Sequence, residues 1–441
     1  MHNFFQHAFV RKSLDLLFKS FAIFGILVVG FIAAVSLQTS PSIGQSSSDK
    51  ETYKQLSLFG DAFQLIRKEY VEDIDDVELI SSAINGMLSD LDPHSSYLPS
   101  KAFSKMQERT KGEFGGLGIE ITMQDGYVLV ITPIDDTPAA RAGIKAGDLI
   151  VRINDKDVLG MTISEAVALM RGPIGSELDI TIRRGEQEMI DITLTRDTIK
   201  MRSVRHESFD DVGYIRITNF TDQTTPGLDK AITALKKEHG KKLKGYILDL
   251  RNNPGGLLRE AISVTDSFLE EGEIVSTRGR HDSQNSRYFA VSGDVAKGLP
   301  VIVLINSGSA SASEIVAGAL KDHERAVIMG TRSFGKGSVQ SIIPMPGHGA
   351  VRITTARYYT PSGVSIQGTG IEPDIKVELA IVEDIDEGAI REEDLNGALE
   401  NTSTTEDEDA ADEDIRDIKD YQLSRAIDLI QGLHVFKNVL P

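Results

Sequence analysis

The sequence contains no cysteine among its 441 residues. This absence excludes disulfide bridges, metal sites with thiolate ligands and a cysteine nucleophile. Positive charge is also in short supply, because 47 lysine and arginine residues stand against 66 aspartate and glutamate residues, giving a formal net charge of −19. We therefore expect no nucleic-acid partner, since binding phosphates requires a basic face. The length leaves room for two or three domains.

One long uncharged apolar run, Phe21–Leu37, follows Arg11, Lys12 and Lys19. In a helix this run spans roughly 25 Å, slightly less than a hydrocarbon core. The positive flank is expected to stay in the cytoplasm, so that the chain after it is exported to the periplasmic side. Small residues at 34–36 also fit a signal-peptidase site. Residues 1–37 are thus predicted to be either a retained inner-membrane anchor, which the length of the run favours, or a cleaved signal peptide.

Helical spacing of apolar residues predicts an N-terminal helical region over residues 51–112, after a serine-rich linker at 38–50. We expect these helices to serve in packing or dimerisation. A turn at residues 90–94, with the sequence DLDPH, interrupts the helical pattern. His94 is expected to have a turn or capping role there.

Residues 113–198 are predicted to form a module of short strands with two helices. The expected helices are 138–142 and 163–170, and the expected strands include 127–132, 149–154, 178–183 and 189–195. With the loop Gly116-Leu117-Gly118-Ile119, these features resemble a PDZ domain, in which such a loop binds the terminal carboxylate of a peptide. Consecutive backbone amides in a tight glycine turn form an anion-binding nest, and the adjoining strand edge accepts a peptide strand.

The groove between this loop and the helix 163–170 is expected to be apolar and so to favour apolar C-terminal residues. The predicted peptide-contacting residues are Gly116, Leu117, Gly118, Ile119, Val167, Met170 and Arg171. Arg171 follows the groove helix, and two interpretations stay open for it. It either senses a bound peptide or is simply a favourable charge at the helix C-terminus.

Strand–helix alternation after Gly213 predicts an α/β domain at residues 199–380, with a central sheet covered by helices. The expected strands are 213–218, 245–250, 301–305, 326–329, 338–343 and 350–355, and the expected helices are 228–239, 257–269 and 311–321. Residues 381–417 are acidic and poor in large apolar side chains, which predicts a disordered segment. Within the C-terminal residues 418–441, an amphipathic helix at Tyr421–Val435 is expected to dock onto the protein or onto a second subunit.

The turn between strand 301–305 and helix 311–321 carries three serines, Ser309, Ser311 and Ser313. Ser311 stands where the helix begins, so its hydroxyl can point out of the turn with helix amides behind it. This placement makes Ser311 the candidate nucleophile for attack on a peptide bond.

Attack on a peptide bond also needs donors for the oxyanion. The amide of Ala312 follows the candidate nucleophile, and Gly255 and Gly256 follow another strand with unobstructed N–H groups. The alternative for both motifs is that small residues simply allow a strand and a helix to pack closely.

Lys336, framed by two glycines, is the candidate proton acceptor. A lysine base must be neutral part of the time, and burial lowers its pKa from about 10.4 by disfavouring the ammonium. Gln340, four residues on, is placed to hold the amine. A histidine base is the alternative, with His206, His239, His281, His323 and His348 in the α/β part. None of these lies in a glycine-framed loop, which favours a Ser–Lys pair over a Ser–His pair.

Six features occur in order over about residues 51–380. They are LDPHSSYL at 91–98, the PDZ-like module, LDLRNNPGG at 248–256, NSGSASASEIVAGALKD at 306–322, SFGKGSVQ at 333–340 and RYYTPSGVSIQGTGIEPD at 357–374. Together they resemble the carboxy-terminal processing peptidases, also called tail-specific proteases. The resemblance implies that Ser311 is the nucleophile, Lys336 the general base and Gln340 its orienting partner. It also implies that the amides of Ala312 and of one glycine at 255–256 bind the oxyanion.

The resemblance further implies an α+β multidomain fold with an α/β peptidase core of the ClpP/crotonase-like type. The implied activity is that of an exported serine endopeptidase that recognises C-terminal tails of protein substrates through its PDZ domain. No cofactor and no metal are expected, and a homodimer is one expected assembly. Two other classes stay open: a PDZ peptide-binding scaffold with an inert peptidase core, and an acyl-transfer enzyme on a related core.

Overall fold

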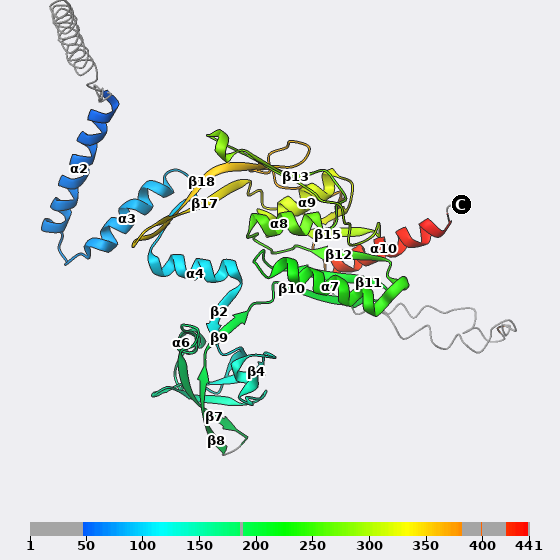
Figure 1. Ribbon diagram of the computed structural model, residues 1–441, viewed down its shortest axis with the longest axis horizontal. Helices are drawn as coiled ribbons and strands as arrows, with labels where there is room; N and C mark the ends of the chain where they lie inside the picture. The colour runs from blue at the N-terminus through cyan, green and yellow to red at the C-terminus, as the bar shows by residue number, and fades with distance from the viewer. Residues whose placement is uncertain (1–46, 186–187, 382–397, 399–419, 440–441) are drawn as a thin grey trace, which may run out of the picture. The chain divides into compact units, whose positions relative to one another are not determined.

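The computed structural model describes residues 47–185, 188–381, 398 and 420–439 (Figure 1). The predicted signal peptide or anchor at 1–37 and almost all of the predicted acidic segment at 381–417 lie outside these residues. No helix within the described part is long and apolar enough to cross a membrane. The chain divides into two compact units, residues 1–80 and 81–441.

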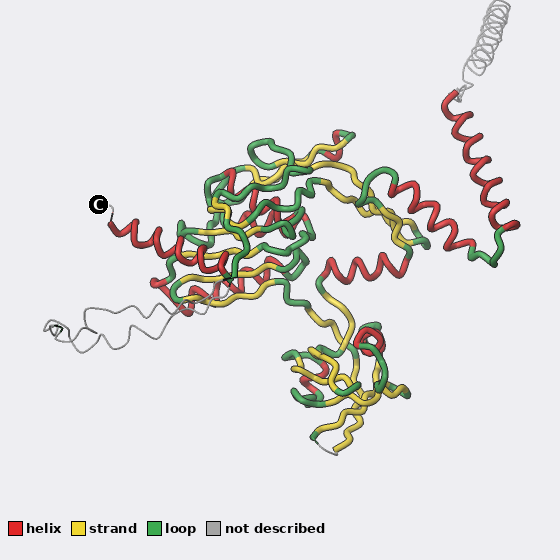
Figure 2. Tube along the Cα trace, turned by 180° about the vertical axis from the view of Figure 1, so that it is seen from behind, coloured by secondary structure: helices red, strands yellow, loops and turns green. Residues whose placement is uncertain are grey.

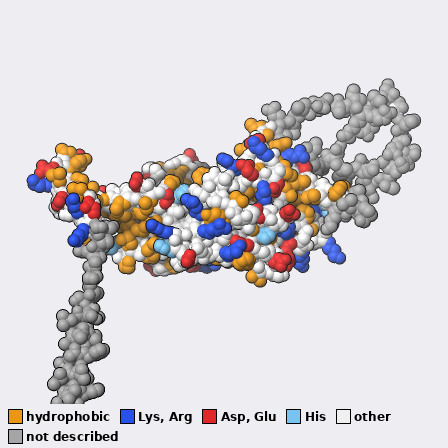
Figure 3. Space-filling model, turned by 90° about the horizontal axis from the view of Figure 1, so that it is seen from above, with side chains coloured by type: hydrophobic (Ala, Val, Ile, Leu, Met, Phe, Trp, Pro, Cys, Tyr) orange, Lys and Arg blue, Asp and Glu red, His pale blue; other side chains and the backbone are white. Residues whose placement is uncertain are grey.

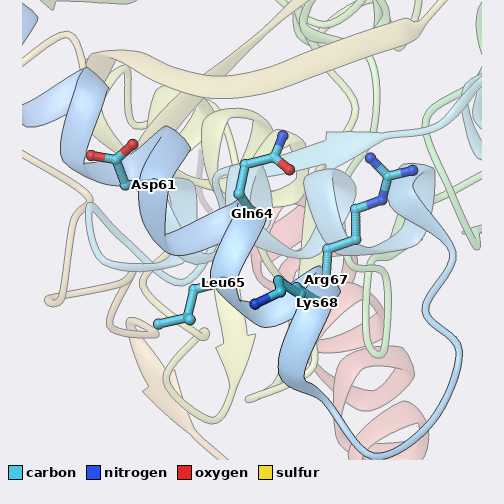
Figure 4. A pocket seen from close by; sticks show the side chains of 5 residues that line it. All are labelled: Asp61, Gln64, Leu65, Arg67 and Lys68. Atoms are coloured by element: carbon cyan, nitrogen blue, oxygen red, sulfur yellow. The ribbon is translucent and has the colours of Figure 1, made fainter.

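The first unit contains helix α2 (Ser47–Glu69) and the first turn of α3 (Asp76–Ser89). Helix α2 begins inside the predicted linker, because the serines and the aspartate at 47–49 are residue types favoured where helices start. Large apolar side chains along α2 are exposed, namely Tyr53, Leu56, Leu58, Phe59, Leu65, Ile66 and Tyr70. Figure 4 shows Asp61, Gln64, Leu65, Arg67 and Lys68, which line a shallow pocket on this one helix and are all exposed.

The module at residues 113–200 is an antiparallel sheet with two short helices. Its strands are β3 (Ile119–Gln124), β4 (Tyr127–Pro133), β5 (Leu149–Ile153), β6 (Lys156–Asp157), β7 (Glu177–Arg184) and β8 (Glu188–Thr195), and its helices are α5 (Pro138–Arg141) and α6 (Ile163–Met170). The strands run in the order β3-β4-β5-β7-β8, and β6 pairs with β5. Beside this sheet, β2 (Glu113–Gly116) pairs antiparallel with β9 (Asp197–Lys200), so one ladder joins the chain entering the module to the chain leaving it.

The α/β core is built on a six-stranded sheet in the order β10-β11-β12-β15-β16-β19. Its strands are β10 (Val204–Phe209), β11 (Val212–Ile217), β12 (Gly245–Asp249), β15 (Val301–Ile305), β16 (Val327–Gly330) and β19 (Ile375–Lys376). All neighbours are parallel except β10 with β11. The two edge strands, β10 and β19, were not predicted from the sequence.

Helices cover both faces of this sheet (Figure 1, Figure 2). One face packs against α7 (Thr224–His239), α8 (Leu258–Asp266) and α9 (Ala312–Asp322), and the short 3-10 helices η1 (Gly240–Lys242) and η2 (Asp282–Gln284) belong to its connections. The other face packs against α10 (Tyr421–Val439) through Leu423, Ala426, Ile427 and Ile430. The predicted C-terminal helix therefore docks onto the sheet of its own chain.

A second sheet in the order β1-β18-β13-β14 carries β17 on β18. Its strands are β1 (Ser96–Leu98), β13 (Glu273–Gly279), β14 (Ser286–Phe289), β17 (Ser338–Met345) and β18 (Gly349–Tyr359). Strand β1 lies in the region predicted to be helical, between α3 and α4 (Ser100–Lys111), and it pairs antiparallel with β18. The paired residues of β18 lie 252 to 256 positions further along the chain, so helical spacing around β1 gave no sign of the pairing. The segment before the PDZ module thus completes a sheet of the peptidase core.

Acidic and basic side chains are interspersed on the face of the described surface in Figure 3. No broad basic stripe is visible on that face, in keeping with the net charge of −19.

Candidate active site

Two loops meet at the carboxyl end of the central sheet, one after β12 and one after β15. These strands are parallel neighbours, so both loops leave the sheet at the same edge. Asn252 and Asn306 exchange two hydrogen bonds between the loops, at 2.9 and 3.0 Å. The N–H of Ala310 donates to the carbonyl of Asn253 at 3.0 Å. The LDLRNNPGG and NSGSAS motifs therefore form one joined surface.

Ser311 occupies the last position before α9 with φ +56° and ψ −109°. Positive φ is uncommon for a non-glycine residue and is held only where the surroundings determine it. Ser311 is half-buried and lines a cavity of about 710 Å³ together with Lys336 and Gln340. The three residues predicted from the sequence to form the catalytic site thus line one cavity.

The other two serines of the turn have structural partners. Ser309 and Ser313 are completely buried. The Ser309 hydroxyl donates to the carbonyl of Leu250 at 2.8 Å, and the Ser313 hydroxyl donates to the carbonyl of Asn253 at 2.9 Å. Both hydroxyls hold the loop after β12 against the start of α9, and neither residue lines the cavity.

The glycine pair lies directly against the candidate nucleophile. A Cβ added at Gly255 would lie 2.9 Å from the Cβ of Ser311 and 2.9 Å from the nitrogen of Ala312, at φ +99°. The Gly255 N–H donates to the side-chain oxygen of Asn253 at 2.9 Å. Among the described residues, the N–H groups of Gly256 and Ala312 have no acceptor. This geometry favours Gly256 over Gly255 as the second oxyanion donor.

Glu314 joins the nucleophile turn to the lysine loop. Its carboxylate is completely buried and accepts the N–H groups of Ser311 at 2.7 Å, Gly335 at 2.6 Å and Lys336 at 2.9 Å. It also accepts the hydroxyl of Ser333 at 2.6 Å. Burial raises the pKa of Glu314, although these four hydrogen bonds act in the opposite direction.

Lys336 is half-buried and lines the cavity. Burial, and then the guanidinium of Arg352, lower the pKa of Lys336, while the carboxylates of Asp92 and Glu314 oppose this change. A lowered pKa increases the fraction of neutral amine at a given pH. The environment of Lys336 is therefore suited to accepting a proton.

Gln340 has one side-chain atom, Oε1, that accepts no hydrogen bond from the described residues. Its Nε2 donates to the hydroxyl of Thr354 at 2.7 Å and to that of Ser338 at 3.3 Å. Its Oε1 is buried and has no partner among the described residues. Strand β17 starts only at Ser338, and the register with β18 shifts between Val339 and Gln340. Simple strand alternation from Lys336 therefore does not apply, and the bulge sets the direction of the Gln340 side chain.

The histidines of the α/β part lie elsewhere. None of them lines the cavity of Ser311 within the described residues. His323 contacts the carbonyl of Glu273 at 2.7 Å, and His239 pairs with Asp211 at 3.6 Å. His94 is the histidine that interacts electrostatically with Lys336, whose charge, after burial, lowers the pKa of His94. Among the described residues, the lining of this cavity therefore favours a lysine over a histidine as the base.

A buried charge network supports the loop that carries the glycine pair. Asp249 is completely buried and accepts hydrogen bonds from Tyr214 at 2.7 Å, Arg216 at 3.0 Å and Arg251 at 2.7 Å. Burial and the Asp249 charge raise the pKa of Tyr214 to about 12. The same Arg251 guanidinium reaches Asp420, immediately before α10, at 2.7 Å.

The predicted PDZ contacts line one small pocket. All seven residues take part, together with Phe114, Ile121, Ile134 and Ile199. The N–H groups of Leu117 and Gly118 have no acceptor among the described residues. Gly118 has φ +77°, and a Cβ there would lie 2.3 Å from Thr137. The Arg171 guanidinium stacks over Phe114, 4.0 Å from the ring centre.

Comparison with known proteins identifies the family. The model of Peptidase family S41 matches residues 211–377, that of the PDZ domain matches 129–184, and that of the activating protease CtpB N-terminal domain matches 28–102. The carboxy-terminal-processing protease of Bartonella bacilliformis is 50% identical over 415 residues, covering 92% of this chain and 96% of that protein. The chain belongs to the carboxy-terminal-processing protease family.

Two further relatives of this family are similar to the chain. The carboxy-terminal processing protease CtpA of Bacillus subtilis is 37% identical over 345 residues, covering 78% of this chain and 71% of that protein. The solved photosystem II D1 C-terminal processing protease is 29% identical, with a TM-score of 0.44, and the match covers 73% of this chain and 92% of that one. The chain is a serine-type peptidase with a PDZ domain and an S41 core. The family models and the two relatives at 50% and 37% identity confirm the family resemblance and the enzyme class expected from the motifs, and the elements described above confirm the mixed helix-and-sheet fold.

Sequence analysis assigned no function to two residues beside the cavity of this carboxy-terminal-processing protease. Glu314 falls three residues after Ser311, and a Ser-x-x-Glu spacing at a helix start is a recognisable capping pattern. Asp92 belongs to LDPHSSYL, which counted toward the resemblance but received no role. Its approach to Lys336 depends on the pairing of β1 with β18, which local spacing does not reveal.

Proposed function

We propose that the protein is an exported serine endopeptidase that binds the C-terminal tails of protein substrates and cleaves them with Ser311 and Lys336. Ser311 attacks the scissile carbonyl while neutral Lys336 takes its proton. The amides of Ala312 and Gly256 receive the oxyanion, and Gln340 Oε1 holds the lysine amine. The observation that carries the proposal is the shared cavity lined by Ser311, Lys336, Gln340 and Gly256.

The catalytic assignment is tested with a peptide substrate and purified variants. Ser311→Ala and Lys336→Ala should fold and show essentially no turnover. Lys336→Arg should fail as well, because a guanidinium stays protonated. His323→Ala serves as the control and should keep its activity. Turnover by Lys336→Arg contradicts the lysine base.

The same assay separates the two other classes. A PDZ scaffold with an inert core binds peptides and turns none over, even as the wild-type protein. An acyl-transfer enzyme turns over esters in preference to peptides. Peptide hydrolysis that depends on both Ser311 and Lys336 excludes both alternatives.

Tail recognition is proposed for the pocket in the PDZ domain. The free N–H groups of Leu117 and Gly118 suit a terminal carboxylate, and Val167 and Met170 suit an apolar terminal side chain. A substrate whose C-terminus is amidated, or ends in aspartate, should be cleaved more slowly than its free-acid apolar parent. Trypsin acting on matched peptides controls for differences in the scissile segment. Equal turnover of free-acid and amidated substrates by the intact enzyme contradicts carboxylate recognition.

Arg171 is proposed to report peptide binding to the peptidase core. Its stacking on Phe114 places it at the edge of the pocket. Arg171→Ala should reduce the difference between free-acid and amidated substrates, while Arg183→Ala, which removes a comparable arginine–aromatic stack over Tyr127, should leave it unchanged. Identical behaviour of the two variants leaves Arg171 as a simple helix-end charge.

Export, membrane association and dimerisation are proposed from the N-terminal part of the chain. The apolar run at 21–37 with its basic flank supports export, and the exposed apolar side chains of α2 support a homodimer. Fractionation of the cell tests export, and N-terminal sequencing of the mature protein distinguishes an anchor from a cleaved signal.

Sedimentation of the protein and of a Leu56→Asp, Phe59→Asp variant tests the homodimer. A cytoplasmic protein contradicts export, and a monomer at all concentrations contradicts the dimer.

A further inference from the structure

The loop before β1 reaches the lysine end of the cavity from outside the S41 core. Ser96 and Arg352 are Cα partners in the β1–β18 ladder, which places residues 92–95 beside the neighbouring part of β18. The N–H of Thr354, on β18, donates to the Ser95 hydroxyl at 3.2 Å. Strand β17 lies on β18 with Gln340 opposite Thr354. The loop and Gln340 are therefore joined through a single residue.

Asp92 is the acceptor at the end of this chain of hydrogen bonds. Its Oδ1 accepts the N–H groups of His94 at 2.8 Å and Ser95 at 2.9 Å, and its Oδ2 accepts the Ser95 hydroxyl at 2.7 Å. Burial opposes the change, but the Ser95 hydroxyl, the N–H groups of the turn and the nearby Thr354 side chain lower the pKa of Asp92. An ionised carboxylate only accepts, so the Ser95 hydroxyl gives its proton to Asp92 and uses a lone pair to accept the N–H of Thr354.

The direction of these bonds decides which end of the Gln340 amide is left without a partner. The Thr354 hydroxyl accepts from Gln340 Nε2 at 2.7 Å, and the nearby Asp92 carboxylate favours this direction because it attracts the hydroxyl proton away from Gln340. Thr354 therefore holds the Nε2 end of the amide, and Ser338 accepts the other Nε2 proton. Oε1 is left buried and unpartnered. A reversed network would hold Oε1 and turn the NH2 group toward the lysine.

We propose that Asp92 is a positioning residue for the proton acceptor: through Thr354 it fixes Gln340 with Oε1 toward Lys336. The inference rests on the proposed Ser311–Lys336 chemistry and extends it to a residue that lies before the PDZ domain. Peptidase function therefore depends on the LDPHSSYL segment as well as on the S41 core.

Asp92 also contributes its charge to the lysine environment. The charged groups facing Lys336 are Asp92 from this loop, Arg352 from β18 and Glu314 from α9, and His94 lies beside them. Arg109 and Arg259 line the same cavity from α4 and α8. Removal of the Asp92 charge takes away a group that favours the ammonium. The pKa of Lys336 then falls further, so activity begins at a lower pH.

The test is the pH dependence of kcat for Asp92→Asn, with Asp90→Asn as the matched control. Asparagine keeps an oxygen for the N–H groups of His94 and Ser95, so the turn is retained, but its NH2 group donates where Oδ2 accepted. We expect the kcat of Asp92→Asn at the plateau of the pH profile to be about tenfold lower than that of the wild type, because a group that positions the proton acceptor is lost. We also expect the acidic limb of the profile to move to lower pH. Asp90 is exposed two residues earlier, and its variant should match the wild type. If Asp92 has only a structural role, Asp92→Asn lowers kcat without moving the acidic limb of the pH profile, and the proposal is overturned.

Thr354→Val separates the hydrogen bond from the charge. This variant breaks the link to Gln340 and keeps Asp92 ionised, so the plateau should fall while the acidic limb stays in place. Thr354→Val also tests the proposal if Asp92→Asn fails to fold. A wild-type plateau in Thr354→Val overturns the inference.

A double-mutant comparison tests the orientation of the amide directly. A glutamate at 340 presents an acceptor to Lys336 whichever way it is turned. In the Gln340→Glu background, Asp92→Asn should therefore cost less than about twofold in kcat, against about tenfold in the wild type. Equal losses in both backgrounds overturn the proposal.

The catalytic variants distinguish the two levels of failure. If Ser311→Ala and Lys336→Ala retain turnover, the proposed function itself is wrong. If both are inactive while Asp92→Asn and Thr354→Val behave as Asp90→Asn does, only the positioning role is wrong.

Discussion

Arg251 and Asp420 form an ion pair at 2.7 Å although 169 residues separate them in the chain. Arg251 begins the loop that leads to Gly255 and Gly256, and Asp420 stands immediately before α10. Although burial opposes it, hydrogen bonds from Arg251 to Asp249 and Asp420 raise the pKa of the guanidinium above its ordinary value. The C-terminal helix is thus tied to the loop of the candidate oxyanion site.

The first prediction concerns this tie. Asp420→Ala should lower the free energy of unfolding by about 1–2 kcal/mol, below the range for a fully buried pair because the Asp420 side chain is 38% exposed. It should also lower kcat, since the loop after β12 loses one anchor. Chemical denaturation and peptide turnover measure the two effects. Asp428→Ala removes an exposed carboxylate from the same helix and should change neither. Unchanged stability in Asp420→Ala contradicts the prediction.

The second prediction concerns the three serines of the turn. Ser309→Ala and Ser313→Ala each remove a buried hydroxyl that donates to a carbonyl of the loop after β12, so each should cost about 1 kcal/mol of stability. Both should keep measurable turnover. Ser311→Ala should melt close to the wild type and show no turnover, because Ser311 is half-buried, lines the cavity and is the proposed nucleophile. Thermal melting and peptide hydrolysis, read side by side, decide the assignment. Loss of all activity in Ser309→Ala with Ser311→Ala still active would reverse it.

The third prediction concerns Glu314. Glutamine has the same shape but only one acceptor oxygen, so Glu314→Gln sets an NH2 group against some of the four donors around it. We expect a loss of about 1–3 kcal/mol in stability, together with a lower kcat because the turn at Ser311 and the loop at Lys336 share this one carboxylate. Glu324→Gln, an exposed change after the same helix, is the control. Ser333→Ala removes one of the four donors and should have a smaller effect. Wild-type stability and turnover in Glu314→Gln would show that the bridge is dispensable.

The fourth prediction uses the lowered pKa of Lys336. The folded state releases this proton at a lower pH than the unfolded chain, whose lysine titrates near 10.5. Between the two pKa values the unfolded state binds more protons, so stability rises with pH, and the full cost of the buried ammonium is present below both. Lys336→Met should therefore be more stable than the wild type at neutral pH, by a margin that shrinks as pH approaches 10.5. Melting temperatures across this pH range measure the margin.

The matched control for this effect is Lys241→Met, because Lys241 is exposed. Its stability should differ little from the wild type at any pH. Activity of the wild type should rise with pH through the lowered pKa of Lys336, since only the neutral amine accepts a proton. A destabilised Lys336→Met at neutral pH would show that the ammonium makes a net favourable contribution to folding.

The sequence alone determined the elements with strong local signals. The apolar run Val301–Ile305 is fully buried strand β15, and the groove helix Ile163–Met170 is helix α6 with the predicted bounds. Small residues before α9 and glycines after β12 marked the two turns, because few residue types adopt such backbone angles. Ser311, Lys336 and Gln340 were nominated by glycine framing and by the order of the motifs.

Tertiary structure decided which of these groups lie close together. Sequence could not choose between Gly255 and Gly256, because the choice depends on the Asn253 side chain, which takes the Gly255 N–H. It could not place Asp92 near Lys336, because that approach requires β1 to pair with a strand more than 250 positions further along the chain, the Cα partners being 252 to 256 residues apart. Local spacing records which side chains share a helix or strand face, whereas contacts between distant segments arise only when the sheets assemble. The direction of the hydrogen bonds across β17, β18 and the Asp92 loop is set only when these segments assemble, so it cannot be predicted from any one of their residues.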